Sequence, residues 1–332
     1  MNQRKLAGRK VPAIGLGCMN LSHGYGLTLS LADAERVLRD AHDLGVTHFD
    51  TAPLYGFGKN EDMLGPILEP IRNEIFLASK CGLTGVNGQR VIDGRPETLK
   101  ITCEESLRKL KTEALDLYYL HRWDKNVPVE DSVGALKDLL AEGKILAIGL
   151  SEVSADTLRR AHAVCPIAAV QSEYSLWTRN AEIAVLDACA ALDVAYVAFS
   201  PLARGFFADM NLVSADFVKQ DIRRAMPRFQ NPHLEINQSL LSDYRSLADI
   251  AGCTPGQLAL AWLLQKSPKL HVIPGTTSSE HVRENFAAME VSLNDDVIES
   301  LERLVNQETI SGPRYKPATQ LEIDTEEFET FA

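Results

Sequence analysis

Four side chains within the first 121 residues could together move a proton: Asp50, Tyr55, Lys80 and His121. Three of them end short apolar segments, and Tyr55 lies five residues beyond the first of these. A tyrosine titrates at about pH 10, and a nearby lysine ammonium stabilises the phenolate and lowers that pKa. An aspartate can keep the ammonium charged inside a cleft, and an imidazole can hydrogen-bond a substrate oxygen. The four residue types therefore indicate proton transfer at an oxygen atom.

These side chains can meet only if the elements that carry them deliver them to one place. Short apolar segments, which we interpret as strands, alternate with stretches whose apolar residues recur every three or four positions. Gly45 and Gly143 are expected to end two of the intervening helices. Strands are predicted at 13–18, 46–51, 75–80, 115–121, 145–151, 167–172, 194–200 and 270–274. Eight strands separated by helices predict a (β/α)8 TIM barrel, in which the carboxyl ends of the strands share one face.

The main alternative, an open parallel sheet, lacks its usual nucleotide-binding sequences. The glycines of GLGCMN have the wrong third position and do not lead straight into a helix, and a P-loop sequence is absent. Outside the repeat lie an N-terminal hairpin, a long loop at 203–235 and a tail at 305–332. We expect the loop and the tail to fold over the active-site face. No linker divides the chain, so one barrel domain is expected over residues 1–332.

Composition disfavours several classes of function. The 332 residues carry a net charge of −11, which argues against binding to a nucleic-acid backbone. No apolar run approaches the ~18 residues that a membrane span requires. Pro12, Gly15 and Gly17 interrupt the apolar stretch near the N-terminus, which favours a hairpin over a signal peptide. The six cysteines are scattered, so we expect a cytoplasmic protein with free thiols and no metal.

The chain resembles the aldo-keto reductases over nearly its whole length. The matching segments, in the order of that family, are GLGCMN, FDTAPLYG, LASK, YYLHR, IGLS, VQSEYSL, AFSPLARG and VIPGTTSSEHVRENF. Within this resemblance Asp50, Tyr55, Lys80 and His121 occupy the four catalytic positions of the family. The segments CMNLSHGYG, MPRFQ and SGPRY look like the bacterial and fungal branch of aryl-alcohol dehydrogenases and pyridoxal reductases.

The resemblance implies hydride transfer from a reduced nicotinamide cofactor to an aldehyde or ketone. Tyr55 would give the proton to the developing alkoxide, Lys80 and Asp50 would tune it, and His121 would position the carbonyl. NADP(H) is the expected cofactor and NAD(H) the alternative. The positions that match cofactor contacts are Gly17, Cys18, Met19, Asp50, Ser151, Gln171, Phe199, Ser200, Leu202, Arg204, Gly275, Thr276, Ser278, His281, Glu284 and Asn285.

Each group of these positions has an implied role. Ser151 and Gln171 match the residues that hold the nicotinamide carboxamide, and Phe199 matches a ring that stacks on the nicotinamide. Residues 200–204 fall where the family wraps the pyrophosphate, and the charge of an arginine there suits it. Residues 284 and 285 match contacts with the adenine.

The chain also departs from the family pattern. Glu152 stands where much of the family has asparagine. Gly275 and His281 replace residues that are often basic near the 2′-phosphate of NADPH, leaving the hydroxyl-rich segment 276–279 and Arg283. Helix N-terminal amides and hydroxyls bind phosphate, but a bidentate arginine contributes more. We therefore expect NADPH to be used, with weaker discrimination against NADH than is usual.

The substrate pocket is expected to be apolar and partly aromatic. Its predicted residues are Tyr25, Tyr55, Phe57, His121 and Trp123. His23 and Tyr174 also fall near this face, and each aromatic could equally serve packing. The arginines at 223, 224 and 228 either cover cofactor phosphates, bind an anionic substrate, or belong to a solvated face or to ion pairs within the protein.

Two other functions stay open from the sequence. A nucleotide-binding regulatory subunit would keep the same fold, although the complete set of four catalytic residues favours an enzyme. An NAD-dependent sugar or alcohol dehydrogenase would use the same residues in the opposite direction. The expected partner is a small carbonyl or alcohol substrate, with no nucleic acid and no membrane, and an oligomer is compatible with the sequence.

Overall fold

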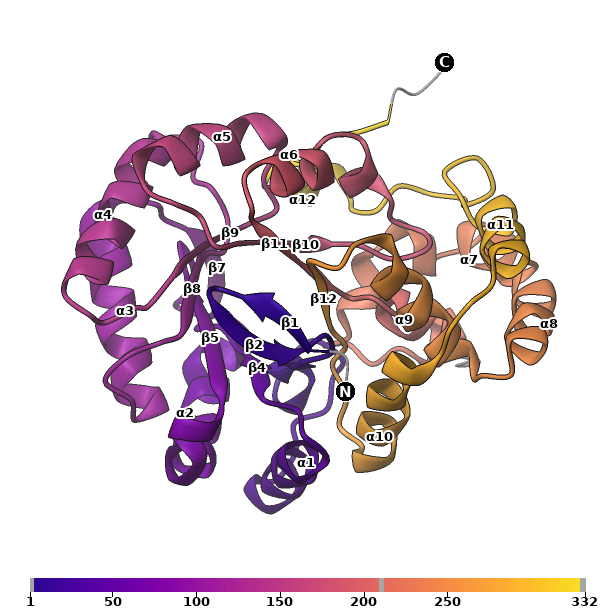
Figure 1. Ribbon diagram of the computed structural model, residues 1–332, viewed down its shortest axis with the longest axis horizontal. Coiled ribbons are helices and arrows are strands. Elements are labelled where there is room, and N and C mark those ends of the chain that lie inside the picture. Colours follow the sequence, from indigo (N-terminus) through magenta and orange to yellow (C-terminus); the bar gives the residue numbers. More distant parts are fainter. Residues whose placement is uncertain (1–2, 209–211, 329–332) are drawn as a thin grey trace.

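The chain folds into a closed barrel of eight parallel strands, described over residues 3–208 and 212–328 of a computed structural model (Figure 1). The strands follow one another around the barrel in the order of the chain. Closure comes from backbone hydrogen bonds between the first and last strands, Gly15 N to Val272 O at 2.9 Å and Val272 N to Ala13 O at 3.0 Å. The predicted (β/α)8 barrel is confirmed.

The barrel strands are short and lie within or close to their predicted limits. They are β3 (Leu16–Gly17), β4 (His48–Asp50), β5 (Phe76–Cys81), β8 (Leu117–Leu120), β9 (Ile148–Ser151), β10 (Ala169–Glu173), β11 (Ala195–Phe199) and β12 (Leu270–Ile273). The first is only two residues long, and Ile14, just before it, joins β12 through an isolated bridge.

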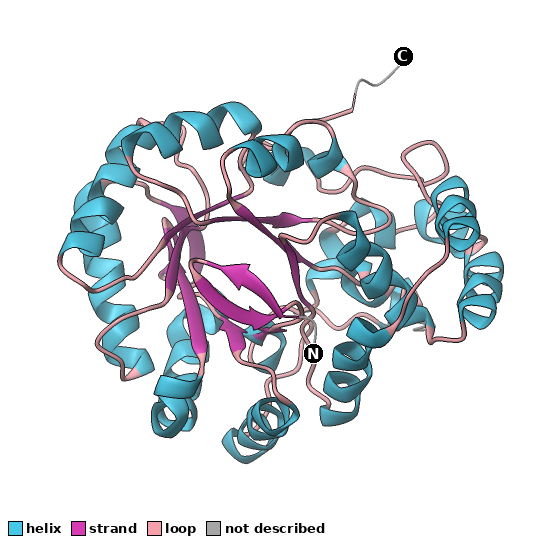
Figure 2. Ribbon diagram, viewed as in Figure 1, coloured by secondary structure: helices cyan, strands magenta, loops and turns pink. Residues whose placement is uncertain are grey.

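Helices cover the outside of the barrel (Figure 2). In the first of them, Ser30 accepts a hydrogen bond from Asp33 N, and Ala34, Val37, Leu38 and Ala41 face the core. The predicted helix stops Gly45 and Gly143 have φ values of 104° and 74°, which glycine adopts most easily. The helices are α1 (Leu31–Leu44), α2 (Lys59–Leu68), α3 (Pro96–Leu110), α4 (Val129–Ala141), α5 (Ala155–Val164), α6 (Val185–Ala191), α7 (His233–Gln238), α8 (Leu241–Ala251), α9 (Pro255–Lys266), α10 (Ser279–Ala287), α11 (Asp295–Leu304) and α12 (Pro317–Gln320).

The predicted N-terminal hairpin closes the amino-terminal end of the barrel. It consists of β1 (Gln3–Leu6) and β2 (Arg9–Pro12), and it lies across the middle of the barrel in Figure 1. Leu6 and Val11 are buried against residues of the barrel interior that include Phe76, Tyr119 and Val197. Access to the interior is therefore left at the carboxyl ends of the strands.

A second hairpin, which was not predicted, follows β5. It is formed by β6 (Leu83–Val86) and β7 (Gln89–Ile92), with Asn87 and Gly88 in the turn at φ values of 51° and 76°. An Asn-Gly turn between two short strands is the usual signal for such a hairpin. The predicted long loop at 203–235 is present as short 3-10 turns that lead into α7, with residues 209–211 outside the described part.

The tail crosses the carboxyl ends of β9 and β10, as expected. We call residues 313–326 the strap. Lys125 Nζ donates to Ile323 O at 3.0 Å, and Asp324 accepts from Ser154 Oγ at 2.9 Å and Thr157 Oγ1 at 2.7 Å. Asp324 thus adds a carboxylate to the N-terminus of α5, where the helix dipole favours negative charge.

Within the described residues, no single helix has the length and apolar character of a membrane span. The segments His233–Ala251 and Pro255–Lys266 reach those limits only together, and they are bent by 74° relative to each other.

Candidate active site

The four predicted catalytic side chains meet at the carboxyl ends of β4, β5 and β8. Asp50 is the last residue of β4, Lys80 lies near the end of β5, and His121 follows β8 with its N–H bonded to Cys81 O at 2.8 Å. Lys80 Nζ donates to Asp50 Oδ1, and it lies 2.8 Å from Thr51 O and 3.4 Å from the Tyr55 hydroxyl. The Tyr55 and His121 rings lie edge to face, 6.0 Å apart.

Burial and charge set the protonation states of these groups. Burial alone would lower the pKa of Lys80, but Asp50 and Tyr55 raise it above its ordinary value, so the ammonium stays charged. Burial raises the pKa of Tyr55, and the charge of Lys80 reduces this rise without cancelling it. Our expectation of a lowered tyrosine pKa is therefore wrong for the protein without a bound ligand, because desolvation is the larger effect.

His121 is held in its neutral form. Burial, and after it the charges of Lys80, Arg122 and Arg90, lower the pKa of this imidazole well below its ordinary value. Its Nδ1 atom is buried and has no hydrogen-bond partner among the described residues. A neutral imidazole beside a charged ammonium can hydrogen-bond a substrate oxygen without competing for the proton of Tyr55.

A buried asparagine, missed by the sequence argument, fixes the loops around Tyr55. Asn60 accepts from Thr51 Oγ1 at 2.6 Å and donates to Cys18 O at 2.9 Å and to Ser22 Oγ at 2.7 Å. It thereby joins the loop after β4 to the turn after β3. No local pattern marks Asn60, since its partners lie up to 42 residues away.

The residues assigned to the nicotinamide lie around the four catalytic side chains. Ser151 ends β9, and Gln171 on β10 donates to Asp50 Oδ2 at 2.7 Å. Phe199 ends β11 with its ring partly exposed. The Ser151 hydroxyl and the Gln171 amide, which contacts the Asp50 that holds Lys80, suit a planar carboxamide-bearing ring, so these residues fit a nicotinamide.

Gly17 and Gly275, both assigned to the cofactor, lie side by side where the barrel closes. A Cβ atom on Gly275 would come within 3.0 Å of Gly17 O and 2.7 Å of Asn20 Oδ1. The side chain of Asn20 also donates to Gly275 O at 3.2 Å. The missing basic residue at 275 therefore has a steric reason. Cys18 and Met19 begin the turn that follows Gly17.

The residues assigned to the 2′-phosphate and adenine gather at the start of α10. Ser278 caps this helix by accepting from His281 N, and Thr276 Oγ1 lies 3.4 Å from His281 Nδ1. Arg283 points to Asp40 on α1, 3.7 Å away, and is mostly exposed. Glu284 accepts from Thr254 Oγ1 at 2.5 Å, and the neighbouring Asn285 is buried.

Arg204 does not offer a free charge to a pyrophosphate in this structure. It is buried, lies 2.8 Å from Glu173 Oε2, and donates to the Tyr315 hydroxyl at 3.1 Å. Arg314 of the strap joins the same cluster, 2.8 Å from Glu152 Oε1 and 3.0 Å from Glu173 Oε2. The role predicted for Arg204 would require Glu173 to release it. Ser200 and Leu202, assigned with Arg204, lie in the turn before it.

The charges in this cluster are strongly coupled. Burial alone would raise the pKa of Glu173, but Arg314, Arg204 and Arg228 hold it at about 2. Glu152, noted above as a departure from the family, thus has a structural partner in Arg314, which is 162 residues away in the chain. Such a separation has no local signature in the sequence.

The predicted substrate residues separate into two groups. His23 and Phe57 extend the aromatic surface outward from Tyr55, since the His23 ring lies 6.2 Å from that of Tyr55 and 6.3 Å from that of Phe57. Phe57 is 48% exposed, as expected at the mouth of a pocket. Tyr25 is only partly buried and lies under the guanidinium of Arg223, 5.0 Å from its ring centre.

Trp123 and Tyr174 serve packing in the structure. Trp123 donates its indole N–H to Val127 O at 2.9 Å, and its ring faces Arg160 of α5 at 5.6 Å. Tyr174 is fully buried and donates to Glu182 Oε1 at 2.6 Å. The packing alternative therefore describes these two aromatics better than a substrate contact does.

The three arginines of the long loop are used within the protein. Arg223 pairs with Asp221 at 2.7 Å, and Arg224 donates to Phe217 O at 2.8 Å. Arg228 donates to Trp177 O at 2.5 Å and to Gly312 O at 3.0 Å. Of the three, Arg223 thus forms the predicted internal ion pair, whereas Arg224, which is exposed, and Arg228 donate to backbone carbonyls.

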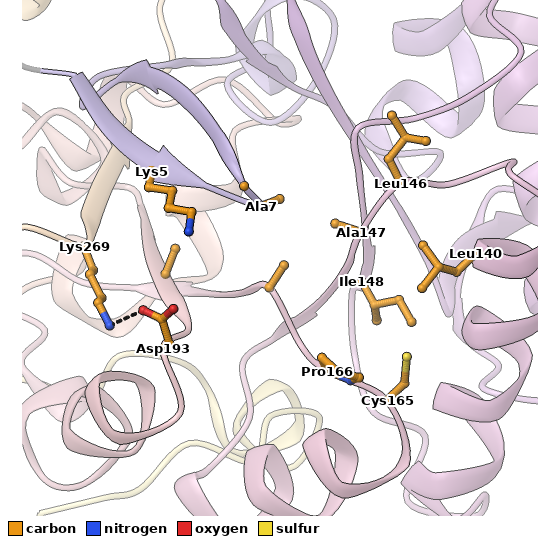
Figure 3. A pocket seen from close by; sticks show the side chains of 13 residues that line it. Lys5, Ala7, Leu140, Leu146, Ala147, Ile148, Cys165, Pro166, Asp193 and Lys269 are labelled. Carbon is orange, nitrogen blue, oxygen red and sulfur yellow. Dashed lines mark ion pairs between the residues drawn. The ribbon is translucent and has the colours of Figure 1, made fainter.

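A separate cavity of about 430 Å³ lies at the opposite end of the barrel, beside the N-terminal hairpin. Figure 3 shows its mouth, where Lys269 pairs with Asp193, and its mainly apolar wall of Leu140, Leu146 and Ile148. None of the four catalytic residues lines this cavity. Within the described residues, no cluster of three or more histidine, cysteine or acidic side chains could hold a metal ion.

Comparison with known proteins agrees with this barrel. The model of the aldo/keto reductase family matches residues 13–306. A probable aldo-keto reductase 1 of Glycine max is 40% identical over 310 residues, covering 93% of this chain and 89% of its own. The aldo-keto reductase yakc of Schizosaccharomyces pombe, whose name specifies NADP(+), is 38% identical over 96% of both chains.

Solved structures agree with the fold. The glycerol dehydrogenase AKR11B4 of Gluconobacter oxydans superimposes with a TM-score of 0.84 at 27% identity, covering 91% of this chain and 94% of its own. An aldo/keto reductase of Klebsiella pneumoniae, in complex with NADP and acetate, gives a TM-score of 0.72 at 28% identity, covering 95% and 99%. The fold and site define an oxidoreductase built on a (β/α)8 barrel. The chain belongs to the aldo/keto reductase family.

Proposed function

We propose that the protein reduces a small aldehyde or ketone to the alcohol with NADPH, and that Tyr55 is the proton donor. The observation that carries this proposal is the contact of Lys80 with both Asp50 and the Tyr55 hydroxyl, beside the neutral imidazole of His121. The relative from Schizosaccharomyces pombe that is named for NADP(+) supports the choice of cofactor.

The cofactor, when bound, would supply the hydride. The residues of the chain bind and protonate the carbonyl oxygen that becomes the hydroxyl of the alcohol. The Tyr55 hydroxyl donates its proton to the developing alkoxide, while Lys80 stabilises the phenolate that forms. Asp50 and Thr51 O hold the ammonium in place, so that little reorganisation is needed. His121 hydrogen-bonds the carbonyl oxygen and orients it toward Tyr55. Ser151 and Gln171 would hold the carboxamide of the cofactor.

The proposal is tested by following NADPH and NADH oxidation optically with aryl aldehydes, pyridoxal, methylglyoxal and aldoses. We expect turnover by the wild-type protein and a loss of at least about a thousandfold in kcat with Tyr55→Phe, which removes one hydroxyl. Cofactor affinity should persist in this variant, as measured by quenching of protein fluorescence. Nucleotide binding without turnover on any of these compounds would favour the regulatory subunit instead.

The same assay measures cofactor choice. Because Gly275 leaves no room for a basic side chain and Arg283 faces Asp40, we expect the kcat/KM values for NADPH and NADH to differ by less than about a hundredfold. A larger preference for NADPH would contradict this weakened phosphate site.

A second candidate is oxidation of a sugar or other alcohol with NAD. It is favoured by the weakened phosphate site and by the structural similarity to a protein named glycerol dehydrogenase. Faster turnover with NAD and glycerol or an aldose than with NADPH and any aldehyde would favour alcohol oxidation over carbonyl reduction.

A further inference from the structure

Arg122 is a buried arginine next to the catalytic histidine, and the reaction as described does not use it. Arg122 is only 7% exposed. One terminal nitrogen, Nη1, donates to His121 O at 2.7 Å and lies 3.3 Å from Ser151 Oγ. Its Nε–H is buried and has no partner among the described residues. The guanidinium therefore reaches from the end of β8 to the end of β9, where the predicted nicotinamide contacts begin.

Arg122 differs from the other buried cations in lacking a carboxylate partner. In the described part of the chain, five lysine and arginine residues are buried: Lys80, Arg122, Arg204, Arg223 and Arg314. All except Arg122 have a nitrogen atom within 4 Å of a carboxylate oxygen of an aspartate or glutamate. For Arg122 the described residues supply no such partner.

A buried charge without a counter-ion is unfavourable, so an arginine that lacks one is a candidate for binding an anionic ligand. The neighbourhood of Arg122 adds to the positive potential. The charges of Arg122 and Arg90 both act on His121, while Arg90 itself pairs with Glu322 of the strap at 2.6 Å. The surplus positive charge beside the catalytic oxygen site thus belongs to Arg122.

We propose that Arg122 selects a carbonyl substrate that carries a carboxylate, which the guanidinium binds while Tyr55 and His121 hold the carbonyl oxygen. The planar fork of an arginine matches a carboxylate better than any neutral group. Neighbouring strand ends are about 4.8 Å apart, so the carboxylate must lie close to the reacting carbonyl. This inference rests on the reductase activity proposed above.

The test compares acids with neutral esters of the same shape. We would measure NADPH-dependent kcat/KM for 2-, 3- and 4-carboxybenzaldehyde and for the methyl ester of each, which scans the distance between carboxylate and carbonyl. The variants are Arg122→Gln, which keeps a donor near Ser151, and Arg122→Lys, which keeps the charge without the fork. Arg36→Gln on the exposed face of α1 is the matched control.

We expect the wild-type protein to prefer at least one acid over its ester by about tenfold or more. Arg122→Gln should lower kcat/KM for that acid by about 10- to 100-fold, mainly through KM, and change the ester by less than about threefold. Arg122→Lys should recover part of the loss. The affinity for NADPH, measured by fluorescence titration, should stay within about threefold, because the proposed contact is with substrate.

Two results would overturn the assignment. Equal losses for acids and esters would show that Arg122 supports the site as a whole, and a matching loss of NADPH affinity would assign it to the cofactor. The acid-to-ester ratio of the wild-type protein needs no variant, so it remains decisive even if Arg122→Gln does not fold. Normal turnover of esters without preference for any acid would refute this inference alone, whereas absence of all turnover would refute the proposed reductase.

Discussion

At the scale of single residues, the site is governed by a competition between desolvation and nearby charge. Tyr55 and Lys80 are in contact, yet burial raises the pKa of the phenol more than the ammonium lowers it. A raised pKa keeps Tyr55 protonated throughout the neutral range, which is the form that a proton donor requires. The same balance works against oxidation of an alcohol, which needs the phenolate.

This balance predicts the pH dependence of reduction. Because the donor must be protonated and its pKa lies above the ordinary value of about 10, kcat/KM should stay level through neutral pH and fall only in alkaline solution. His121, whose pKa is lowered, should remain neutral and cause no fall between about pH 6 and 7. The check is a pH profile of kcat/KM for a neutral aldehyde. A decline centred near pH 7 would contradict both assignments.

At the scale of the elements, buried ion pairs join the strap to the barrel. Arg314 lies between Glu152 at the end of β9 and Glu173 at the end of β10, and all three are at least nine-tenths buried. Removing one partner of such a cluster leaves an uncompensated charge, which costs more than the pairing itself contributes.

We therefore predict that Arg314→Met destabilises the protein by about 3–5 kcal/mol, measured by urea denaturation, and exposes residues 313–326 to limited proteolysis. The exposed Arg303, whose side chain donates to Ser300 Oγ at 3.3 Å, supplies the control Arg303→Met. The triple change Arg314→Met, Glu152→Gln and Glu173→Gln should recover part of the loss. If Arg314→Met were as stable as the control, the cluster would have no structural role.

The elements and the catalytic residues were predictable from the sequence, whereas their long-range charge contacts were not. Apolar periodicity located the eight strands, and each catalytic residue stood at or just beyond a strand end, where a barrel gathers side chains. The hairpin at 83–92 carries an Asn-Gly turn signal, but its strands are too short to show a clear alternation of apolar residues. Glu152 and the SGPRY segment were each noticed, but their pairing depends on the folded barrel. Arg122 could be singled out only after burial showed that it lacks a partner.

At the scale of the whole molecule, two buried histidines at the hairpin end of the barrel couple folding to pH. His48 and His271 are both fully buried, and burial lowers the pKa of each to about 3. Neither ring nitrogen of His48 has a partner among the described residues, and only Nε2 of His271 has one, Lys5 O at 3.4 Å. Both rings are therefore neutral in the folded protein at any moderate pH.

Because the unfolded chain binds protons below its histidine pKa of about 6.5 and the folded protein does not until about 3, stability should fall as the pH drops through this interval. Each histidine should lower the free energy of unfolding by about 2 kcal/mol between pH 7 and pH 5. Urea denaturation of wild-type and His48→Gln proteins at both pH values tests this, with the partly exposed His162→Gln as control. If the free energy of unfolding fell equally from pH 7 to pH 5 in His48→Gln and in the wild type, His48 would be excluded as a cause.

The position of Arg314 also has a consequence for how the protein is made. Glu152 is translated 162 residues before Arg314, so the end of β9 carries a carboxylate without this partner until the strap is made, whereas Glu173 also pairs with Arg204. During that interval the nascent chain exposes the surface that the strap will cover, which chaperones and proteases recognise in incomplete proteins. Only a chain translated through Arg314 can therefore complete the ion cluster at the ends of β9 and β10.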